Sequence, residues 1–360
     1  MKSAIVFEII MKSYDGLWNK FITYNNLYLA YKNARKVNPN SSVVLNFSFN
    51  LETNLLRIQN ELITGHYEVS KYNIFTIYEP KERIIKSLPF KDRIVQHALI
   101  NIIEPIFEKV FIYNSFACRK KKGINLAFKK LKKLVQSNNY PKYFLKSDVK
   151  KYFFSVDKKI LKHIISKRIK DTKLLFLIFK IIDSDNSNIS NNKGIPIGNL
   201  TSQLFANIYL NELDQFVKHN LHIKHYFRYM DDFLFFSNSK NQLNKYSHYI
   251  RNFMKCKLKL KLPKKKTNIC LTKDGVDFVG YKIFHEYVQI RKTSLIRFTK
   301  RTKHKIFLFN NNKITNTQLE SSICSFLGFC KYADSYRIIN KIFDLNFNDY
   351  KYLFYKIFIK

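Results

Sequence analysis

Apolar residues in the first quarter of the chain recur at intervals that are typical of helices. This spacing extends over residues 12–45, and a second helix is predicted over 51–63. Alternating, β-rich residues follow at 72–78 and at 83–88, with a polar turn between the two runs. That arrangement predicts a β-hairpin with basic residues at its tip. Apolar periodicity resumes at Phe90 and predicts a further helix.

Further along, two adjacent acids interrupt an otherwise apolar run. Residues 226–236 place aromatic and aliphatic side chains on both sides of Asp231 and Asp232, which predicts two short strands with the acids at the turn between them. Upstream, residues 143–149 read as a strand that ends in an acid, Asp148. Adjacent carboxylates repel each other and are costly to hold beside a hydrophobic sheet, and a divalent cation relieves both problems. The alternative is an ordinary Asp-rich turn, since Asp is common in turns.

The remaining stretches alternate between loop-like and helical patterns. Residues 183–193 are rich in Ser and Asn and predict a surface loop. A helix with an apolar stripe is predicted over 204–217, and another amphipathic helix over 240–256. Residues 275–281 have the pattern of a hairpin, and the chain beyond them is helical and basic.

The charge of the chain indicates a polyanionic partner. The 360 residues carry a formal net charge of +38, from 64 basic and 26 acidic side chains. Cations that neutralise phosphates release counterions, which favours binding to nucleic acid. Compositional bias accounts for the excess of Lys over Arg but not for the scarcity of acids. Aromatic residues make up 16% of the chain, which excludes a disordered basic tail, and the length predicts two or three subdomains.

The cysteines and the N-terminal residues indicate a cytoplasmic protein. The five cysteines are scattered, odd in number and without paired metal spacing, so free thiols in a reducing compartment are expected. The apolar run at residues 4–10 is broken by Glu8 and is too short to span a membrane. It also lacks a signal-peptide cleavage region. No membrane partner is expected.

A strand-end acid together with an acid pair at a hairpin turn is the palm pattern of nucleotidyl transfer, and further motifs extend it. The chain resembles reverse transcriptases of bacterial retroelements over nearly its whole length. Where most retroviral and group II intron enzymes carry Gln-Gly and Ser-Pro, this chain carries Ile197-Gly198 and Ser202-Gln203. In this it is similar to the enzymes of diversity-generating retroelements. The other motifs of the resemblance are Glu79-Pro80-Lys81, Asn114-Ser115-Phe116-Ala117-Cys118-Arg119 and Arg228-Tyr229-Met230-Asp231-Asp232-Phe233.

The resemblance implies an α/β fold with the right-hand architecture of polymerases, which consists of fingers, an α+β palm and a small helical thumb. The boundaries that follow are an N-terminal helical extension at 1–45, fingers at 46–140, a palm with interleaved fingers helices at 141–285, and a thumb at 286–360. The implied reaction is the template-directed addition of deoxynucleotides, with RNA as the template.

The resemblance also implies the catalytic groups. Asp148, Asp231 and Asp232 would bind two Mg²⁺ ions, with Mn²⁺ as the alternative, to activate the primer 3′-hydroxyl and stabilise the leaving pyrophosphate. In this family a lysine is thought to protonate the pyrophosphate as a general acid. The candidate is Lys265, and the sequence does not separate it from Lys264 and Lys266.

Further residues are implied to contact the nucleotide, template or primer. Phe153 stands five residues after Asp148, where a bulky aromatic under the sugar would exclude a 2′-hydroxyl; core packing is its alternative role. A Gln amide at position 197 could hold the nascent base pair, whereas Ile197 has no hydrogen-bonding group, so errors opposite template adenine are expected. The alternative is that Ile197 only packs under the helix that starts near Asn199. The implied nucleotide contacts are Lys81, Arg83, Phe153, Ile197, Gly198 and Gln203, and the implied template or primer contacts are Arg119, Tyr229, Met230 and Gly280.

The implied partners are template RNA, primer, cDNA, dNTPs and a small basic accessory variability protein, and the implied role is mutagenic retrohoming. A retron-type or defence-associated reverse transcriptase is the alternative within the same class. Gly280-Tyr281 lacks the Val-Thr-Gly of retron enzymes, which counts against the first of these. A catalytically idle RNA-binding protein with the same fold is the alternative from another class, but such a protein would not need all three acids.

Overall fold

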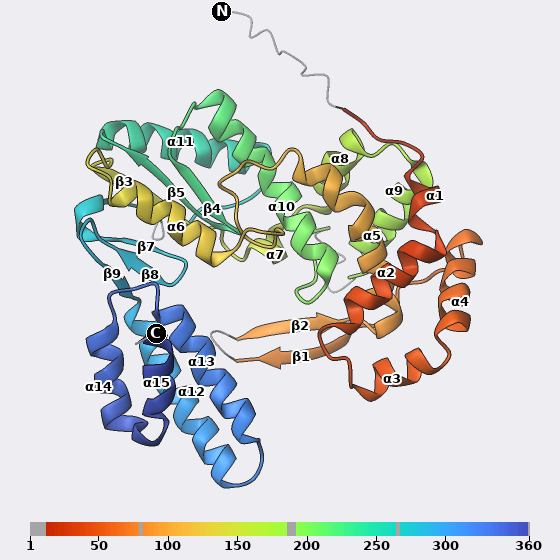
Figure 1. The fold of residues 1–360 in the computed structure, drawn as a ribbon. Coiled ribbons are helices and arrows are strands. Elements are labelled where there is room, and N and C mark those ends of the chain that lie inside the picture. Colours follow the sequence, from red (N-terminus) through yellow and green to blue (C-terminus); the bar gives the residue numbers. More distant parts are fainter. Residues whose placement is uncertain (1–11, 79–81, 186–191, 264–266, 359–360) are drawn as a thin grey trace, which may run out of the picture. The chain divides into compact units, whose positions relative to one another are not determined.

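The computed structural model describes residues 12–78, 82–185, 192–263 and 267–358 (Figure 1). No helix among these residues is long and apolar enough to cross a membrane. The chain folds into two compact units, and it passes between them several times. The first unit takes the described parts of residues 1–121, 147–233 and 245–267, and the second takes those of residues 122–146, 234–244 and 268–360.

The first unit begins with short helices around a longer one. The side chain of Thr23 accepts a hydrogen bond from the Asn26 backbone N–H and so begins α2, and Ser41 caps α3 in the same way. The predicted helical stretch at 12–45 is therefore divided into separate helices. Figure 1 shows α2 lying alongside α5, with which it makes extensive contact. These helices are α1 (Leu17–Phe21), α2 (Tyr24–Arg35), α3 (Ser42–Phe49), α4 (Leu51–Ile63) and α5 (Phe90–Glu108).

The predicted hairpin is present between α4 and α5. Strand β1 (Asn73–Ile77) pairs antiparallel with β2 (Arg83–Ser87), and Phe75 lies opposite Ile85. Most side chains of β1 are exposed, whereas β2 becomes buried toward its end at Lys86. The hairpin is therefore embedded in the unit near Lys86, while Ile77 and Arg83 at the other end of the strands are exposed.

Helix α10 is buried along most of its length and packs against α5 and α8. Asp157 caps α8, since its side chain accepts a hydrogen bond from the Ile160 backbone N–H. The helices predicted at 204–217 and 240–256 are confirmed. The bounds are α7 (Tyr152–Ser155), α8 (Lys158–Arg168), α9 (Thr172–Asp183), α10 (Leu200–Gln215), a π-helical turn (Phe216–Asn220) and α11 (Lys240–Cys256).

A four-stranded sheet carries the predicted acids, and its strand order is β4-β5-β3-β6. Strands β3 and β6 pair antiparallel, with Phe144 opposite Cys270. The apolar runs predicted as strands on both sides of the acid pair are β4 and β5. The bounds are β3 (Tyr143–Ser147), β4 (Tyr226–Tyr229), β5 (Asp232–Ser237) and β6 (Asn268–Leu271).

The second unit combines a small antiparallel sheet with helices. Strands β7 (Val276–Phe278), β8 (Tyr281–Ile283) and β9 (Val288–Ile290) follow one another in the sheet, and α6 (Ile124–Val135) packs against β8. The predicted hairpin is thus confirmed, and its turn residues Val279 and Gly280 both have positive φ. A short 3-10 turn precedes β7 at Thr272–Asp274.

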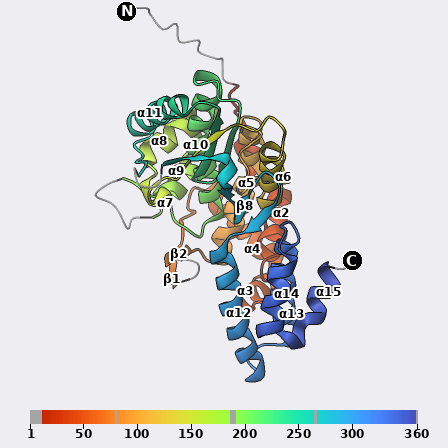
Figure 2. The ribbon, with the colours of Figure 1, turned by 90° about the vertical axis from the view of Figure 1, so that its left-hand side faces the viewer.

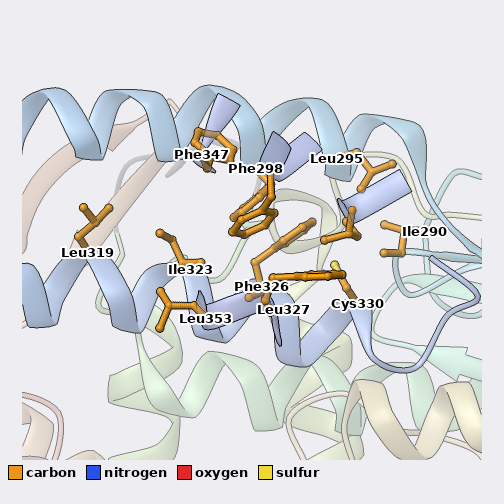
Figure 3. Packing of buried hydrophobic residues seen from close by; sticks show 13 residues of the cluster. Ile290, Leu295, Phe298, Leu319, Ile323, Phe326, Leu327, Cys330, Phe347 and Leu353 are labelled. Carbon is orange, nitrogen blue, oxygen red and sulfur yellow. The ribbon is translucent and has the colours of Figure 1, made fainter. Parts of the chain in front are cut away.

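The helical C-terminal region has an apolar core of its own (Figure 3). Phe298 and Phe326 stack with ring centroids 3.7 Å apart, and Figure 2 shows α12 running beside α13. This agrees with the helices predicted beyond the 275–281 hairpin. Their bounds are α12 (Lys292–Asn310), α13 (Asn316–Cys330), α14 (Tyr336–Asn346), a 3-10 turn (Asn348–Tyr350) and α15 (Lys351–Phe358).

Candidate active site

The acid pair lies at the tight turn between β4 and β5, as predicted. Strand β4 ends at Tyr229 and β5 begins at Asp232, so Met230 and Asp231 alone form the connection. Met230 has a φ of 54°, in the left-handed region, and this bend lets the chain reverse over so few residues. Both acids are half-buried. Burial also raises the pKa of Tyr229, with a contribution from Cys118.

Directly beneath the turn, Arg228 forms an ion pair with Asp214, and both side chains are fully buried. Arg228 Nη1 also donates to the carbonyl oxygen of Met230, at 3.0 Å. We did not predict this pair. A signal was present in the sequence, because an arginine in the middle of an apolar strand needs a buried partner. The pattern alone does not say which acid supplies it.

Asp148 directly follows β3, whose last residue is Ser147, and is half-buried. The Ser147 hydroxyl is hydrogen-bonded to that of Thr267, at 2.9 Å. Tyr152 stands four residues after Asp148, and its hydroxyl donates to the carbonyl oxygen of Ala206, at 2.6 Å.

The environment of Tyr152 places it within electrostatic reach of the acidic turn. Burial raises the pKa of Tyr152 well above its ordinary value, Arg228 lowers it, and Asp231 adds to the rise. The first turn after Asp148 therefore lies near the acid pair. Since β5 lies between β4 and β3 in the sheet, the strand that precedes Asp148 is also a neighbour of the strand that begins at Asp232.

Carboxylate oxygens are the ligands that Mg²⁺ and Mn²⁺ prefer, so the donor chemistry of the three acids suits the predicted ions. The positions of the three side chains do not by themselves form a metal site. Within the described parts of the chain, no group of three or more His, Cys, Asp or Glu side chains is placed to hold a metal ion. Metal binding by Asp148, Asp231 and Asp232 therefore stays a prediction from the donor set and the resemblance.

A glycine-flanked loop brings three of the predicted nucleotide contacts together. The Ile195 backbone N–H donates to the carbonyl oxygen of Phe153, at 2.9 Å, and Gly194 N–H donates to that of Val156, at 2.8 Å. The loop is thus fixed against α7. Phe153 itself is half-buried, whereas Tyr152 is the fully buried aromatic of α7.

The far end of the same loop is bound to the fingers-like hairpin. The Lys86 backbone N–H donates to the carbonyl oxygen of Ile197, at 2.8 Å. Gly198 has a φ of +127°, and a Cβ at this position would lie 2.4 Å from the Lys86 carbonyl oxygen. Only glycine fits this approach. The structure therefore joins Phe153, Ile197 and Gly198 to β2, whose first residue, Arg83, is exposed beside the hairpin tip.

The start of α10 continues this surface. Its N-cap residue, Asn199, is buried and donates through Nδ2 to the Tyr72 hydroxyl, at 3.0 Å. The Leu200 backbone N–H donates to Gln96 Oε1, at 3.1 Å. Gln203, in the first turn of α10, is exposed. It is therefore accessible to a ligand, as its predicted role requires.

Other predicted contacts lie elsewhere or have different partners. Arg119 donates to both carboxylate oxygens of Glu108 and to the carbonyl oxygens of Ile112 and Ser115, with its side chain 4% exposed. These contacts give Arg119 a structural role, and they lend no support to the predicted template contact. Gly280 lies in the second unit, where a Cβ would meet the Phe329 ring at 2.9 Å.

Two predicted cations fall outside the described residues. They are Lys81, assigned to the triphosphate, and Lys265, assigned as the general acid, together with its alternatives Lys264 and Lys266. Their roles stay predictions.

Comparisons with known proteins give a family match that spans the candidate site. The family model described as reverse transcriptase (RNA-dependent DNA polymerase) matches residues 71–283, a range that contains the acids, the loop and the hairpin. Protein YkfC of Escherichia coli (strain K12) is 26% identical over 291 residues, which cover 68% of this chain and 76% of YkfC. The group II intron-encoded protein LtrA of Lactococcus lactis subsp. cremoris is 30% identical over 204 residues, which cover 55% of this chain and 33% of LtrA.

Proposed function

Because the chain belongs to the reverse transcriptase family of RNA-dependent DNA polymerases, we propose that it copies a template RNA into error-prone, adenine-mutagenised cDNA for mutagenic retrohoming. Its mixed helix-and-sheet fold agrees with the palm-type polymerase fold that was predicted. The observation that supports the mutagenic role is the loop in which Ile197 and Gly198 replace Gln and Gly. This loop is hydrogen-bonded to the backbone of Phe153 in α7 and to the backbone of Lys86 in β2.

In the proposed reaction, the primer 3′-oxygen attacks the α-phosphorus of a dNTP, and the bond to pyrophosphate breaks. Reverse transcriptases generally use divalent metal ions, whose positive charge stabilises the charge that develops on the phosphoryl oxygens. We assign Asp148, Asp231 and Asp232 as the carboxylates that bind Mg²⁺ in this chain. Their half-buried position at the ends of neighbouring strands supports the assignment.

The side chain of Ile197 in this loop supplies the physical reason for the expected errors. Ile197 offers the nascent base pair a stiff apolar side chain that neither donates nor accepts a hydrogen bond. A correct pair therefore lacks one contact that would separate it from a mismatch. An A·T pair has fewer hydrogen bonds of its own, so errors should concentrate opposite template adenine. On the sugar side, half-buried Phe153 is positioned by the same loop through its carbonyl oxygen.

The charge of the chain bears on its partners. A net charge of +38 predicts tight but unselective binding to RNA and DNA, with affinity that falls steeply as salt increases. Selective copying of one template repeat then requires RNA structure or the accessory variability protein. Efficient and selective copying of the cognate RNA by the purified enzyme alone would contradict this part of the proposal.

The test of polymerase function is primer extension by the Asp231→Asn variant. This change removes one charge and keeps the shape of the side chain, so extension should be abolished while RNA binding is retained. The matched control is Asp274→Asn, at an exposed acid of the second unit. Robust extension by the Asp231 variant would refute the assignment of the acids.

The mutagenic role is tested separately by sequencing the cDNA that the wild-type enzyme makes. An excess of mismatches opposite template adenine is expected. Equal error rates opposite all four bases would exclude the mutagenic role and leave a reverse transcriptase of another kind.

A further inference from the structure

Arg228 is a fully buried cation at the centre of β4. Removing an ammonium or guanidinium group from water costs several kcal/mol unless the group is paired and its donors are hydrogen-bonded. Such a residue is retained in a strand only where its contacts are well satisfied. The contacts of Arg228 therefore indicate what the arginine does at this position.

Two of its nitrogens bind a single carboxylate. Nε lies 2.8 and 3.0 Å from the two oxygens of Asp214, and Nη2 lies 2.6 Å from Oδ2. The Tyr226 hydroxyl donates to Asp214 Oδ1, at 2.8 Å. The bidentate pair fixes the plane of the guanidinium and hence the direction of its third nitrogen.

That third nitrogen reaches the acidic turn. Nη1 donates to the carbonyl oxygen of Met230, at 3.0 Å, and to Asn207 Oδ1, at 3.1 Å. Met230 is the left-handed residue of the turn, a conformation that is sterically unfavourable for an L-residue. Its carbonyl group belongs to the peptide bond that leads into Asp231. The hydrogen bond from Nη1 therefore holds the strained residue and orients the next one.

The side-chain partners of Arg228 come from one helix. Asn207 and Asp214 are seven residues apart on α10, which is two turns, so they lie on the same face. Asn207 Nδ2 also donates to the carbonyl oxygen of Ala117, at 2.8 Å. The N-terminal end of the same helix follows directly from Gly198 in the candidate nucleotide loop. A rigid helix thus connects the loop to the acidic turn.

We propose that Arg228 is a positioning residue, which aligns Asp231 by fixing the Met230 peptide group relative to α10. The fork geometry of the guanidinium carries this role, because Lys would keep the charge but could not bind Asp214, Asn207 and Met230 at once. The expected loss of turnover rests on the proposed polymerase function. The expected loosening of the turn does not.

The experiment compares Arg228→Lys with Tyr209→Phe. Tyr209 lies on α10 and is also buried, and its hydroxyl donates to the carbonyl oxygen of Leu258, at 2.7 Å, rather than to a partner of Arg228. Arg228→Lys should lower kcat by about 10- to 100-fold, because misplacement of a reacting group by about 1 Å has an effect of that size. The KM for template–primer should change by less than about twofold, since phosphate contacts position the nucleic acid. Tyr209→Phe should leave both constants near those of the wild type.

Because Arg228→Lys leaves a buried charge poorly paired, which can prevent folding, the double variant Arg228→Met with Asp214→Leu is measured as well. Replacing a buried ion pair by apolar side chains of similar volume is often neutral for stability. Amide hydrogen exchange at Asp231 and Asp232 should be at least about tenfold faster in the folded Arg228 variants than in the Tyr209 control.

The outcomes separate the two proposals. An inactive wild-type enzyme would refute the polymerase function, while the exchange rates would still test the positioning role. A folded Arg228 variant with wild-type kcat and wild-type exchange would overturn the positioning role alone.

Discussion

Replacing Gly198 by alanine should displace the loop that carries Ile197. The new Cβ would lie 2.4 Å from the carbonyl oxygen and 3.0 Å from the carbonyl carbon of Lys86. These are backbone atoms of β2, so they cannot rotate away as the end of a side chain could. The hydrogen bond from Lys86 N–H to the Ile197 carbonyl oxygen, now 2.8 Å long, should therefore break or lengthen.

The expected loss of stability and the expected rise in KM follow from these contacts. A φ of +127° in a residue other than glycine costs about 1–3 kcal/mol. The lost hydrogen bond contributes about 0.5–1.5 kcal/mol, so the free energy of unfolding should fall by about 2–4 kcal/mol. If the loop positions the incoming nucleotide, a loss equal to one hydrogen bond raises the KM for dNTP roughly twofold to tenfold.

The assays are thermal unfolding and steady-state primer extension with varied dNTP. The control is Gly65→Ala, where φ is +76° and no atom lies within 4 Å of the added Cβ. In this variant the free energy of unfolding should fall only by the cost of a positive φ in alanine, about 1–2 kcal/mol, and the KM for dNTP should be unchanged. Equal stability losses in the two variants, together with an unchanged dNTP KM for the Gly198 variant, would refute the reasoning.

Three further predictions concern the site and the C-terminal helices. Phe153→Ala should lower the ratio of dNTP to rNTP incorporation efficiency several-fold, and an unchanged ratio would make Phe153 a packing residue only. Ile197→Gln should reduce misincorporation opposite template adenine roughly threefold to tenfold, the equivalent of one hydrogen bond; an unaltered adenine error rate with activity retained would place the infidelity elsewhere. Phe298→Ala removes a ring stacked 3.7 Å from that of Phe326 and should destabilise the second unit by about 3–5 kcal/mol in thermal unfolding. A loss below about 1 kcal/mol would show that these helices do not depend on this stacked pair.

Local patterns in the sequence predicted the elements that carry the site. Alternation identified β1 and β2, and apolar runs around two acids identified β4 and β5 with the turn between them. The helices at 204–217 and 240–256 were also found, because apolar periodicity is a property of residues three and four positions apart. Local reasoning was less accurate at 12–45, where apolar spacing predicted continuous helix. It gave too little weight to Thr23 and Ser41, whose side chains begin new helices.

The roles of the two motif arginines could not be assigned in this way. Arg119 and Arg228 each stand in a motif that the resemblance associates with the site, yet both are bound to acids of the protein itself. Arg119 pairs with Glu108, which lies on α5, and Arg228 pairs with Asp214 on α10. A basic residue in a motif has the same sequence pattern whether it faces nucleic acid or a buried carboxylate. Only its folded environment separates the two.

The sequence by itself determined the elements, the chemistry of the three acids and the position of the glycines, because periodicity, turn preference and charge are properties of neighbouring residues. The tertiary structure decided which distant groups meet. Gly198 must be glycine because a strand more than a hundred positions earlier brings the Lys86 carbonyl oxygen against it. The left-handed Met230 is hydrogen-bonded to Arg228, which is in turn held by Asn207 and Asp214, two turns apart on α10. Such contacts depend on how helices and strands pack, and packing is set by the shapes and buried surfaces of segments that no local pattern relates.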